Sequence, residues 1–169
     1  MADAKAVDSL LSEWFNWKPP SGRLKSISRA IRNQELFIAA TRSRVVGFIH
    51  YVMHEDVIDG GPNSLISAFF VSRAYRGKRI GTLLLDAAVS DSLKKGAVGV
   101  ETSTRHARAK KFYEVHHFEH EKGDIREVFL ELDIPQYLKA RKNPGVPCDE
   151  RVGAVLHTGS RRKLGRDLR

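Results

Sequence analysis

Residues 65–84 read Leu-Ile-Ser-Ala-Phe-Phe-Val-Ser-Arg-Ala-Tyr-Arg-Gly-Lys-Arg-Ile-Gly-Thr-Leu-Leu, and the spacing of their apolar side chains changes once along the stretch. Residues 65–71 are mostly apolar and rich in aromatic and β-branched side chains, which is typical of a buried strand. From Ile80 onward the apolar residues recur at the spacing of one face of an α-helix. The stretch therefore predicts a strand, a short turn and a helix over residues 80–95.

The turn between this strand and helix is crowded with cations and contains two glycines. Free backbone N–H groups at the start of a helix, together with the positive end of its dipole, attract anions, and glycine lets ligand oxygens approach closely. We therefore predict that the turn binds a ligand that carries phosphate. The alternative is an ordinary strand-to-helix connection. The residues of the turn are Arg76, Gly77, Lys78, Arg79, Ile80 and Gly81.

The composition narrows the class of protein. The chain of 169 residues is long enough for one domain with a proper core, and it has no apolar run long enough to cross a membrane, so we expect a soluble, cytoplasmic protein. Cys148 is the only cysteine, which excludes an internal disulfide. Of the net charge of +9, residues 135–169 carry +6. We expect a nearly neutral domain at residues 1–134, followed by a basic, poorly ordered tail.

Hydrophobic periodicity and turn residues predict the order of the elements along the chain. The strand at 65–71, the helix after it and the strand at 97–102 predict a parallel pair joined by a crossover helix. The whole order predicts a mixed α/β (α+β) fold, with a mainly antiparallel central sheet and helices on both faces. Residues 54–63 are predicted to be a polar, acidic loop, and residues 152–156 allow a short strand in the tail. The predicted helices cover residues 6–17, 24–33, 80–95 and 107–114, and the predicted strands cover residues 36–40, 45–52, 65–71, 97–102, 117–120 and 127–134.

A second block, residues 100–118, points to a family. It carries Ala109, Tyr113, Glu114 and Phe118 at the spacing of the pattern Asn-x-x-Ala-x-x-x-Tyr-Glu-x-x-Gly-Phe. This block and the turn together resemble the GNAT superfamily of acetyl-CoA-dependent N-acetyltransferases, whose turn has the pattern Gln/Arg-x-x-Gly-x-Gly/Ala. The resemblance implies the GNAT fold over residues 1–134.

The chain departs from the GNAT patterns at several positions. Arg79 replaces the first glycine of the turn, which matters little provided that Arg79 keeps a helical φ. His106 stands where Asn is usual, and His117 stands where Gly is usual. The usual first strand is also missing, so this edge strand is either absent or supplied by a neighbouring molecule, as in a homodimer.

The resemblance implies how acetyl-CoA, the co-substrate, is held. Backbone groups of Phe69 and Val71 would bind the pantetheine as an added strand where the parallel strands splay, and the turn would hold the pyrophosphate. His106 would have to make the usual Asn contact through a ring nitrogen. The implied cofactor-binding residues are Phe69, Phe70, Val71, Arg76, Gly77, Lys78, Arg79, Ile80, Gly81, Thr82 and His106.

Two residues are predicted to carry the chemistry. A phenol at the thioester sulfur can protonate the departing thiolate, and the resemblance implies this general-acid role for Tyr113. A base is also needed, because amines arrive largely as ammonium ions. Glu101 stands five residues before His106, where ribosomal-protein alanine N-acetyltransferases carry their catalytic glutamate. The alternatives are a Tyr113 hydroxyl that caps local polar groups and a Glu101 that pairs with Arg105 or Arg126.

Other polar residues lie on the predicted acceptor side. Ser67 occupies another common GNAT base position and cannot serve as a base. His50 and His54, with the acidic residues of 55–59, could recognise a cationic substrate, could supply the base through His50, or could simply be solvated.

The predicted function is transfer of the acetyl group of acetyl-CoA to a primary amine, by direct attack in a ternary complex. The acceptor stays open between a protein N-terminus or lysine and a small polyamine or aminoglycoside. The competing interpretations are a nucleic-acid-binding or CoA-sensing protein that uses the basic tail, and a catalytically inactive relative. Because Tyr137 is the only aromatic residue of the tail, we expect any contact with nucleic acid to be weak.

Overall fold

The computed structural model of the chain describes residues 2–15, 19–42, 44–57, 60–120, 128–134, 137 and 155–157. Its helices are α1 (Ala2–Trp14), α2 (Arg23–Arg32), α3 (Ile80–Lys94) and α4 (Ala107–Val115), with a short 3-10 helix at Arg73–Tyr75. Its strands are β1 (Leu36–Ala40), β2 (Val45–Asp56), β3 (Gly61–Val71), β4 (Gly99–Thr104), β5 (Glu119–His120), β6 (Val128–Asp133) and β7 (Val155–His157). The order of these elements agrees with the predicted order.

Within the described residues the strands form one mixed sheet, in the order β5-β6-β4-β3-β2-β1-β7. β3 and β4 are parallel neighbours, as predicted, and α3 connects them. The other neighbouring pairs are antiparallel. The predicted fold class is therefore confirmed.

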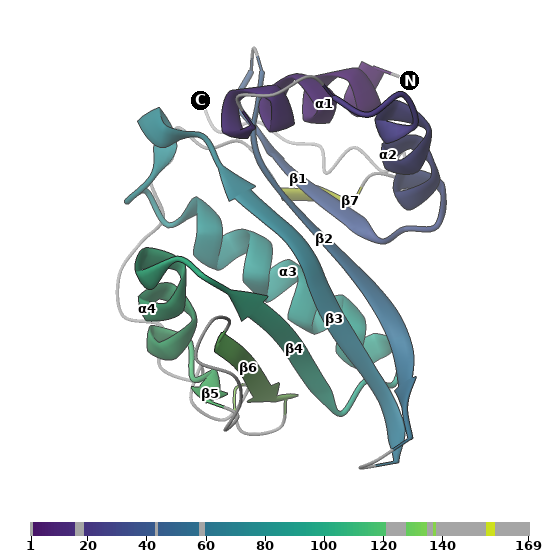
Figure 1. Cartoon of the computed structure of the whole chain (residues 1–169), viewed down its shortest axis with the longest axis vertical. Helices are drawn as coiled ribbons and strands as arrows, with labels where there is room; N and C mark the ends of the chain where they lie inside the picture. Colours follow the sequence, from purple (N-terminus) through teal and green to yellow (C-terminus); the bar gives the residue numbers. More distant parts are fainter. Residues whose placement is uncertain are drawn as a thin grey trace, which may run out of the picture.

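Helices cover both faces of the sheet. α1 and α2 pack against one face through an apolar cluster, and α3 and α4 pack against the other face through a larger one. Consecutive residues of β2 belong to different clusters, Phe48 to the first and Ile49 to the second, as the two-residue period of a strand requires. Figure 1 shows α1 and α2 together at the β1 end of the sheet and α4 beyond β4.

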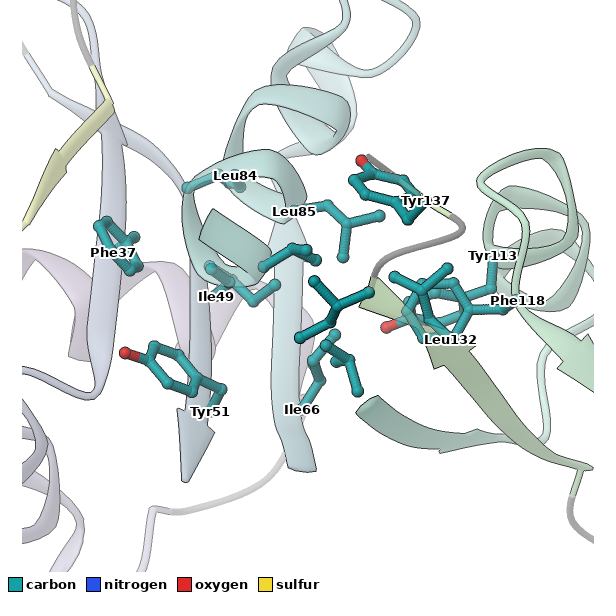
Figure 2. Close-up of a cluster of buried hydrophobic side chains, with 14 of the residues drawn as sticks. Phe37, Ile49, Tyr51, Ile66, Leu84, Leu85, Tyr113, Phe118, Leu132 and Tyr137 are labelled. Atoms are coloured by element: carbon teal, nitrogen blue, oxygen red, sulfur yellow. The ribbon is translucent and has the colours of Figure 1, made fainter. Parts of the chain in front are cut away.

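The larger cluster extends across most of the sheet. Figure 2 shows Phe37 and Tyr51 at one side of it and Tyr113 and Phe118 at the other. The rings of Tyr113 and Phe118 have their centroids 4.9 Å apart. This packing fixes α4, and with it Tyr113, against the sheet.

β2 and β3 are longer than predicted, and the prediction of a loop over residues 54–63 is wrong. The two strands stay paired as far as His54↔Asn63 and Asp56↔Gly61. Strand prediction depended on apolar side chains, whereas backbone pairing between the two strands holds this polar segment extended. The imidazole of His54 is thus placed by a strand.

The ends of two helices shift the strands that follow them. The Ala97 N–H donates to the Ser92 carbonyl at 3.0 Å, so residue 97 closes α3 and β4 begins two residues later than predicted. Phe118 N–H donates to the Tyr113 carbonyl at 3.1 Å and closes α4, so only residues 119–120 remain of the strand predicted at 117–120. Residues 16–17 of the first predicted helix and the turn predicted at 121–124 lie outside the described residues.

β7 occupies the edge of the sheet next to β1. It pairs antiparallel with β1 through Phe37↔His157, Ile38↔Leu156 and Ala39↔Val155. The sequence left two alternatives for the missing edge strand, absence or supply by a neighbour, whereas the structure places the chain's own C-terminal segment there. Most of residues 135–169 lies outside the described residues, but Tyr137 is 2% exposed and its hydroxyl donates to Asp86 of α3.

His117 ends α4 in the left-handed conformation, with a φ of 67°. This conformation costs an L-residue roughly 1 kcal/mol because its Cβ crowds the backbone, whereas glycine adopts it freely. We therefore expect His117→Gly to raise the free energy of unfolding by about 1 kcal/mol, measured by urea denaturation. In contrast, Lys111→Gly, at an exposed position inside the same helix, should lower it by about 1 kcal/mol. A loss of stability in both variants would contradict the assignment of strain to His117.

Candidate active site

β3 and β4 separate toward one end of the sheet. Along these two strands, both described in full, pairing runs from Ser64↔Val100 to Ile66↔Thr102 and stops there. β3 continues to Val71, while β4 stays paired with β6 on its other side. The backbone of β3 beyond Ile66 therefore presents an edge that an extended ligand can occupy as an added strand.

A pocket of about 670 Å³ lies at this separation. Its walls come from the end of β3, the turn before α3, the first turn of α3 and one face of α4. All predicted cofactor-binding residues except Lys78 line it, and so does Tyr113. The structure thus brings the two sequence blocks together around one cavity.

One end of the pocket is the N-terminus of α3. The Arg79 carbonyl accepts the first hydrogen bond of the helix at 3.0 Å, so the amides of Ile80, Gly81 and Thr82 have no partner within the helix. At Gly81 an added Cβ would lie 3.2 Å from Cε2 of Phe112, so glycine allows α3 and α4 to meet closely here. Three amides and the positive end of the helix dipole therefore face one end of the pocket, where they would stabilise an anion.

The cations of the turn are partly engaged within the protein. The Arg76 Nε donates to the Val71 carbonyl at 2.9 Å, and its guanidinium lies 5.6 Å from the centroid of the Phe70 ring. Lys78 Nζ lies 5.2 Å from the centroid of the Tyr75 ring. These cations raise the local positive potential, but the Val71 carbonyl, part of the predicted pantetheine contact, already has a hydrogen-bond partner.

Tyr113 of α4 lies where the two strands separate. It is 5% exposed, and its ring packs 6.3 Å from the ring of Phe69 on β3. Burial raises the pKa of Tyr113 to about 12, and a hydrogen bond with Thr102 acts in the opposite direction. Because Thr102 belongs to the last pair between β3 and β4, the phenol is held at the point of separation. A phenol with this pKa keeps its proton at neutral pH and can donate it.

Glu101 lies outside the residues that line the pocket. Its Oε1 accepts a hydrogen bond from Asn63 Nδ2 at 2.9 Å and lies 3.4 Å from His54 Nε2. The Glu101 carboxylate thus contacts Asn63 and His54, whereas the sequence analysis had considered a pairing with Arg105 or Arg126. Arg126 lies outside the described residues. The Glu101 and His54 side chains are 32% and 36% exposed, while the His54 Nε2 atom that faces Glu101 is itself buried.

A comparison with family profiles decides the family. The profile of the Acetyltransferase (GNAT) family matches residues 4–118, which is more than half of the chain. The chain belongs to this GNAT family of acetyltransferases. A comparison with curated protein sequences finds no significant match.

Solved GNAT structures resemble the fold closely. The PaiA N-acetyltransferase of Thermoplasma acidophilum, in complex with coenzyme A, is 18% identical with a TM-score of 0.61, over 78% of this chain and 93% of that one. Arabidopsis thaliana Naa50, in complex with the bisubstrate analogue CoA-Ac-MVNAL, is 19% identical with a TM-score of 0.62, over 78% and 93%. AAC(6')-Iy, in complex with a bisubstrate analogue built on acetylneamine, is 18% identical with a TM-score of 0.66, over 73% and 89%. At these identities the likeness supports the fold.

The departures from the GNAT patterns have local explanations. Arg79 has a φ of 61°, so the expectation of a helical φ is wrong, and this residue and His117 both hold the left-handed conformation that glycine adopts freely. Gly77 also has a positive φ, because the chain must reverse from the extended Arg76 into α3 within a few residues. His106 is the N-cap residue of α4, and its carbonyl accepts the first hydrogen bond of the helix from Lys110 N–H at 3.0 Å. Its own N–H donates to Thr104 Oγ1 at 3.2 Å, and the residue lines the pocket.

Sequence reasoning missed several residues of the pocket. Arg108, Phe112 and His116 of α4 line it, and their spacing of four places them on one face of the helix, a signal that was present in the sequence. The Thr82 hydroxyl lies 3.0 Å from His116 Nε2 and so links the start of α3 to α4. Trp14 of α1 also lines the pocket, with its ring 5.2 Å from that of Phe70, and only the tertiary fold reveals this contact.

Two other kinds of feature were sought in the described part of the chain. None of its helices combines the length and apolarity that crossing a membrane requires. Nor do three or more of its His, Cys, Asp and Glu side chains come together in a group that could hold a metal ion.

Proposed function

We propose that the protein transfers the acetyl group of acetyl-CoA to a primary amine, by direct attack within a ternary complex. The observation that carries this proposal is the course of the pocket, which joins the amides at the start of α3 to Tyr113 at the separation of β3 and β4. A diphosphate bound at the first end places an extended thioester chain along the unpaired edge of β3. The chemistry of both ends therefore suits acetyl-CoA.

Residues of four segments hold the co-substrate in this proposal. The amides of Ile80, Gly81 and Thr82 bind the pyrophosphate, and the cations of the turn and Arg108 add positive charge. The backbone of β3 around Phe69 binds the pantetheine, and His106 at the start of α4 lines the other side. None of the described residues that line the pocket is a cysteine, so this part of the chain offers no thiol for an acyl-enzyme, which favours direct transfer.

Tyr113 and Glu101 divide the proton transfers in this proposal. The Tyr113 phenol, protonated at neutral pH, donates a proton to the departing thiolate. Glu101 attracts the cationic acceptor and takes a proton from the ammonium ion, directly or through water. The hydrogen bond from Asn63 keeps the Glu101 carboxylate in place.

The acceptor is an amine on a peptide or on a small polycation. Glu101, His54 and Asp56 lie within one network, since Asn63 Nδ2 is within 3.5 Å of a carboxylate oxygen of both acidic residues. A carboxylate pair next to an imidazole favours a cationic ligand. The bisubstrate analogues bound by Naa50 and by AAC(6')-Iy, one with a peptide and one with acetylneamine, represent the two acceptor classes.

Two measurements test the proposal. Isothermal titration of acetyl-CoA into the purified protein should give a dissociation constant in the micromolar range, as expected for a pocket that engages both the diphosphate and the pantetheine. A thiol-release assay should then detect turnover with a panel of a free peptide N-terminus, a lysine peptide, spermidine and kanamycin. A folded protein that binds no acetyl-CoA would contradict the proposal.

The Glu101→Gln variant tests the role of the carboxylate. It keeps the hydrogen bond to Asn63 but removes the charge, so we expect kcat/KM for a cationic acceptor to fall about tenfold while acetyl-CoA binding stays unchanged. Glu119→Gln is the control, because it removes an exposed carboxylate from β5, two strands away from Glu101 in the same row of the sheet. An equal loss in both variants would show that the effect comes from general surface charge.

A further inference from the structure

A short chain of polar side chains lies on the sheet face opposite Tyr113. Ser67 Oγ lies 2.5 Å from His50 Nδ1, and His50 Nε2 lies 3.9 Å from Glu35 Oε2. Given the acetyltransfer proposed above, on which this inference rests, we infer that Ser67 and His50 form a relay that removes a proton from the nitrogen of the attacking amine, with Glu35 stabilising the resulting imidazolium.

A β-bulge sets the position of Ser67, which, like His50, is not among the described residues that line the pocket. In the pairing of β2 with β3, His50 faces Ala68 and Tyr51 faces Ile66, so Ser67 is the extra residue. Ser67 also directly follows Ile66, the last residue of β3 that pairs with β4. The bulge therefore places the Ser67 hydroxyl at the point where the two strands separate.

The relay and Tyr113 approach this point from opposite faces of the sheet. Tyr113 belongs to the cluster under α3 and α4, together with Ile66. His50 lies within electrostatic reach of Arg29 on α2, which packs on the other face. A thioester bound where β3 and β4 separate would have Tyr113, the proton donor, on one side and the relay, the proton acceptor, on the other. Because Ser67 is exposed, an amine can enter from the side of the relay.

The hydrogen-bond directions suit a relay. The Glu35 carboxylate favours the tautomer of neutral His50 that carries its proton on Nε2, because that nitrogen faces the negative charge. Nδ1 is then the acceptor, and the Ser67 hydroxyl donates to it. The lone pairs of Ser67 Oγ remain available toward solvent, where they can accept an N–H of the amine.

The environment of His50 keeps it ready to accept a proton. Burial lowers the pKa of His50 from its ordinary value of 6.5, Glu35 acts in the opposite direction, and Arg29 lowers it further. These are the charged groups that face His50 from the segment before β1 and from α2, while β3 contributes the neutral Ser67. At pH 7 the imidazole is therefore mostly neutral.

The proton count of the reaction requires a second acceptor. An ammonium ion has three N–H bonds and the amide product has one, so two protons leave the nitrogen while the C–N bond forms and the C–S bond breaks. Glu101 takes the first proton before attack. After attack, Ser67 Oγ takes the second and passes its own proton to His50 Nδ1. Tyr113 protonates the thiolate and regains a proton from solvent, so the net products are amide, CoA thiol and one released proton.

Glu101 is less well placed for the second proton. It pairs with Leu65, which is two residues before Ser67, and its carboxylate is held by Asn63, which lies still further from the separation. The relay begins at the separation itself. The two groups therefore act on successive protons.

Three variants test the relay with the amine of the panel above that the wild type acetylates fastest. Ser67→Ala removes the relay hydroxyl from an exposed position, and Ser67→Thr restores it. His50→Asn places an amide oxygen near the position of Nδ1, so the hydrogen bond from Ser67 can remain while the basic nitrogen is lost. We expect Ser67→Ala and His50→Asn each to lower kcat about tenfold with an unchanged KM for acetyl-CoA, and Ser67→Thr to recover at least half of the wild-type value.

The coupling and the pH profile separate a relay from a structural role. If Ser67 and His50 act in one relay, the double variant that combines Ser67→Ala with His50→Asn should lose no more activity than either single variant. The wild-type kcat should fall with decreasing pH below 6.5, as His50 becomes protonated, and His50→Asn should lack this limb. Wild-type kcat in His50→Asn, or losses that multiply in the double variant, would overturn the relay while leaving the acetyltransferase assignment intact. A wild type that acetylates no amine of the panel would overturn both.

Discussion

Tyr113→Phe is expected to lower kcat about 1,000-fold while leaving the affinity for acetyl-CoA within twofold. The variant removes one hydroxyl from a side chain that is 5% exposed and keeps the ring that packs against Phe69 and Phe118. Without the phenol the thiolate must leave unprotonated or take its proton from water. In the proposed complex, binding of the co-substrate depends on backbone amides and cations, which the substitution does not touch. Steady-state kinetics and isothermal titration measure the two quantities separately.

Tyr51→Phe is the matched control for this prediction. It removes the hydroxyl of another buried tyrosine in the same cluster, which donates to Asp91 and does not line the pocket. We expect it to cost about 1 kcal/mol of stability and to leave kcat unchanged. A kcat of Tyr113→Phe within threefold of the wild type would contradict the general-acid role.

The raised pKa of Tyr113 also predicts a pH dependence of stability. The unfolded chain releases this proton near pH 10, whereas the folded protein keeps it up to a pH of about 12. The contribution of Tyr113 to the free energy of unfolding is therefore fully present below pH 10 and is lost as the pH rises through 12, by as much as about 3 kcal/mol. Urea denaturation between pH 9 and 11 should show a shallower loss in Tyr113→Phe than in the wild type.

Gly81→Asp is expected to weaken acetyl-CoA binding by a factor of about 100 or more. The substitution puts a carboxylate at the start of α3, where the amides of Ile80, Gly81 and Thr82 are proposed to bind the pyrophosphate. Two like charges in this site repel, and the side chain fills space that the ligand needs. Isothermal titration of acetyl-CoA measures the loss directly.

Two control variants separate charge from crowding at this position. Gly81→Ala adds the same Cβ, which meets Phe112 at 3.2 Å, without the charge, and should weaken binding only a few-fold. Gly22→Asp adds the same carboxylate before α2, where nothing lies within 4 Å of the new Cβ, and should leave binding unchanged. Wild-type affinity in a folded Gly81→Asp variant would place the diphosphate elsewhere.

Side-chain spacing was enough to predict the elements around the pocket. The change of period at Ile80 located α3, and the block that contains Tyr113 located α4, because both patterns reflect faces buried against the sheet. The boundaries were less predictable. His54 and Asp56 lie in a strand because of backbone pairing, and polar side chains give no sign of that pairing.

The candidate site was predictable in its residue types and less so in its geometry. The turn before α3 pointed to phosphate, but its composition did not show that Arg79 would adopt a positive φ. Ser67 was set aside as unable to act as a base, because its contact with His50 depends on a bulge. A bulge changes the register by one residue and leaves no mark in apolar periodicity.

The sequence by itself determined where the apolar part of each helix and strand around the pocket lies, which glycines and cations surround the start of α3, and which family patterns the chain carries. These properties are local, since they depend on spacing within one or two turns or strands. Only the tertiary structure decided that β7 covers the edge of β1, that Glu101 is held by Asn63, and that Ser67 and Tyr113 approach the separation of β3 and β4 from opposite faces. These contacts join residues far apart in the chain, and strand register and helix packing fix them once the whole sheet has formed.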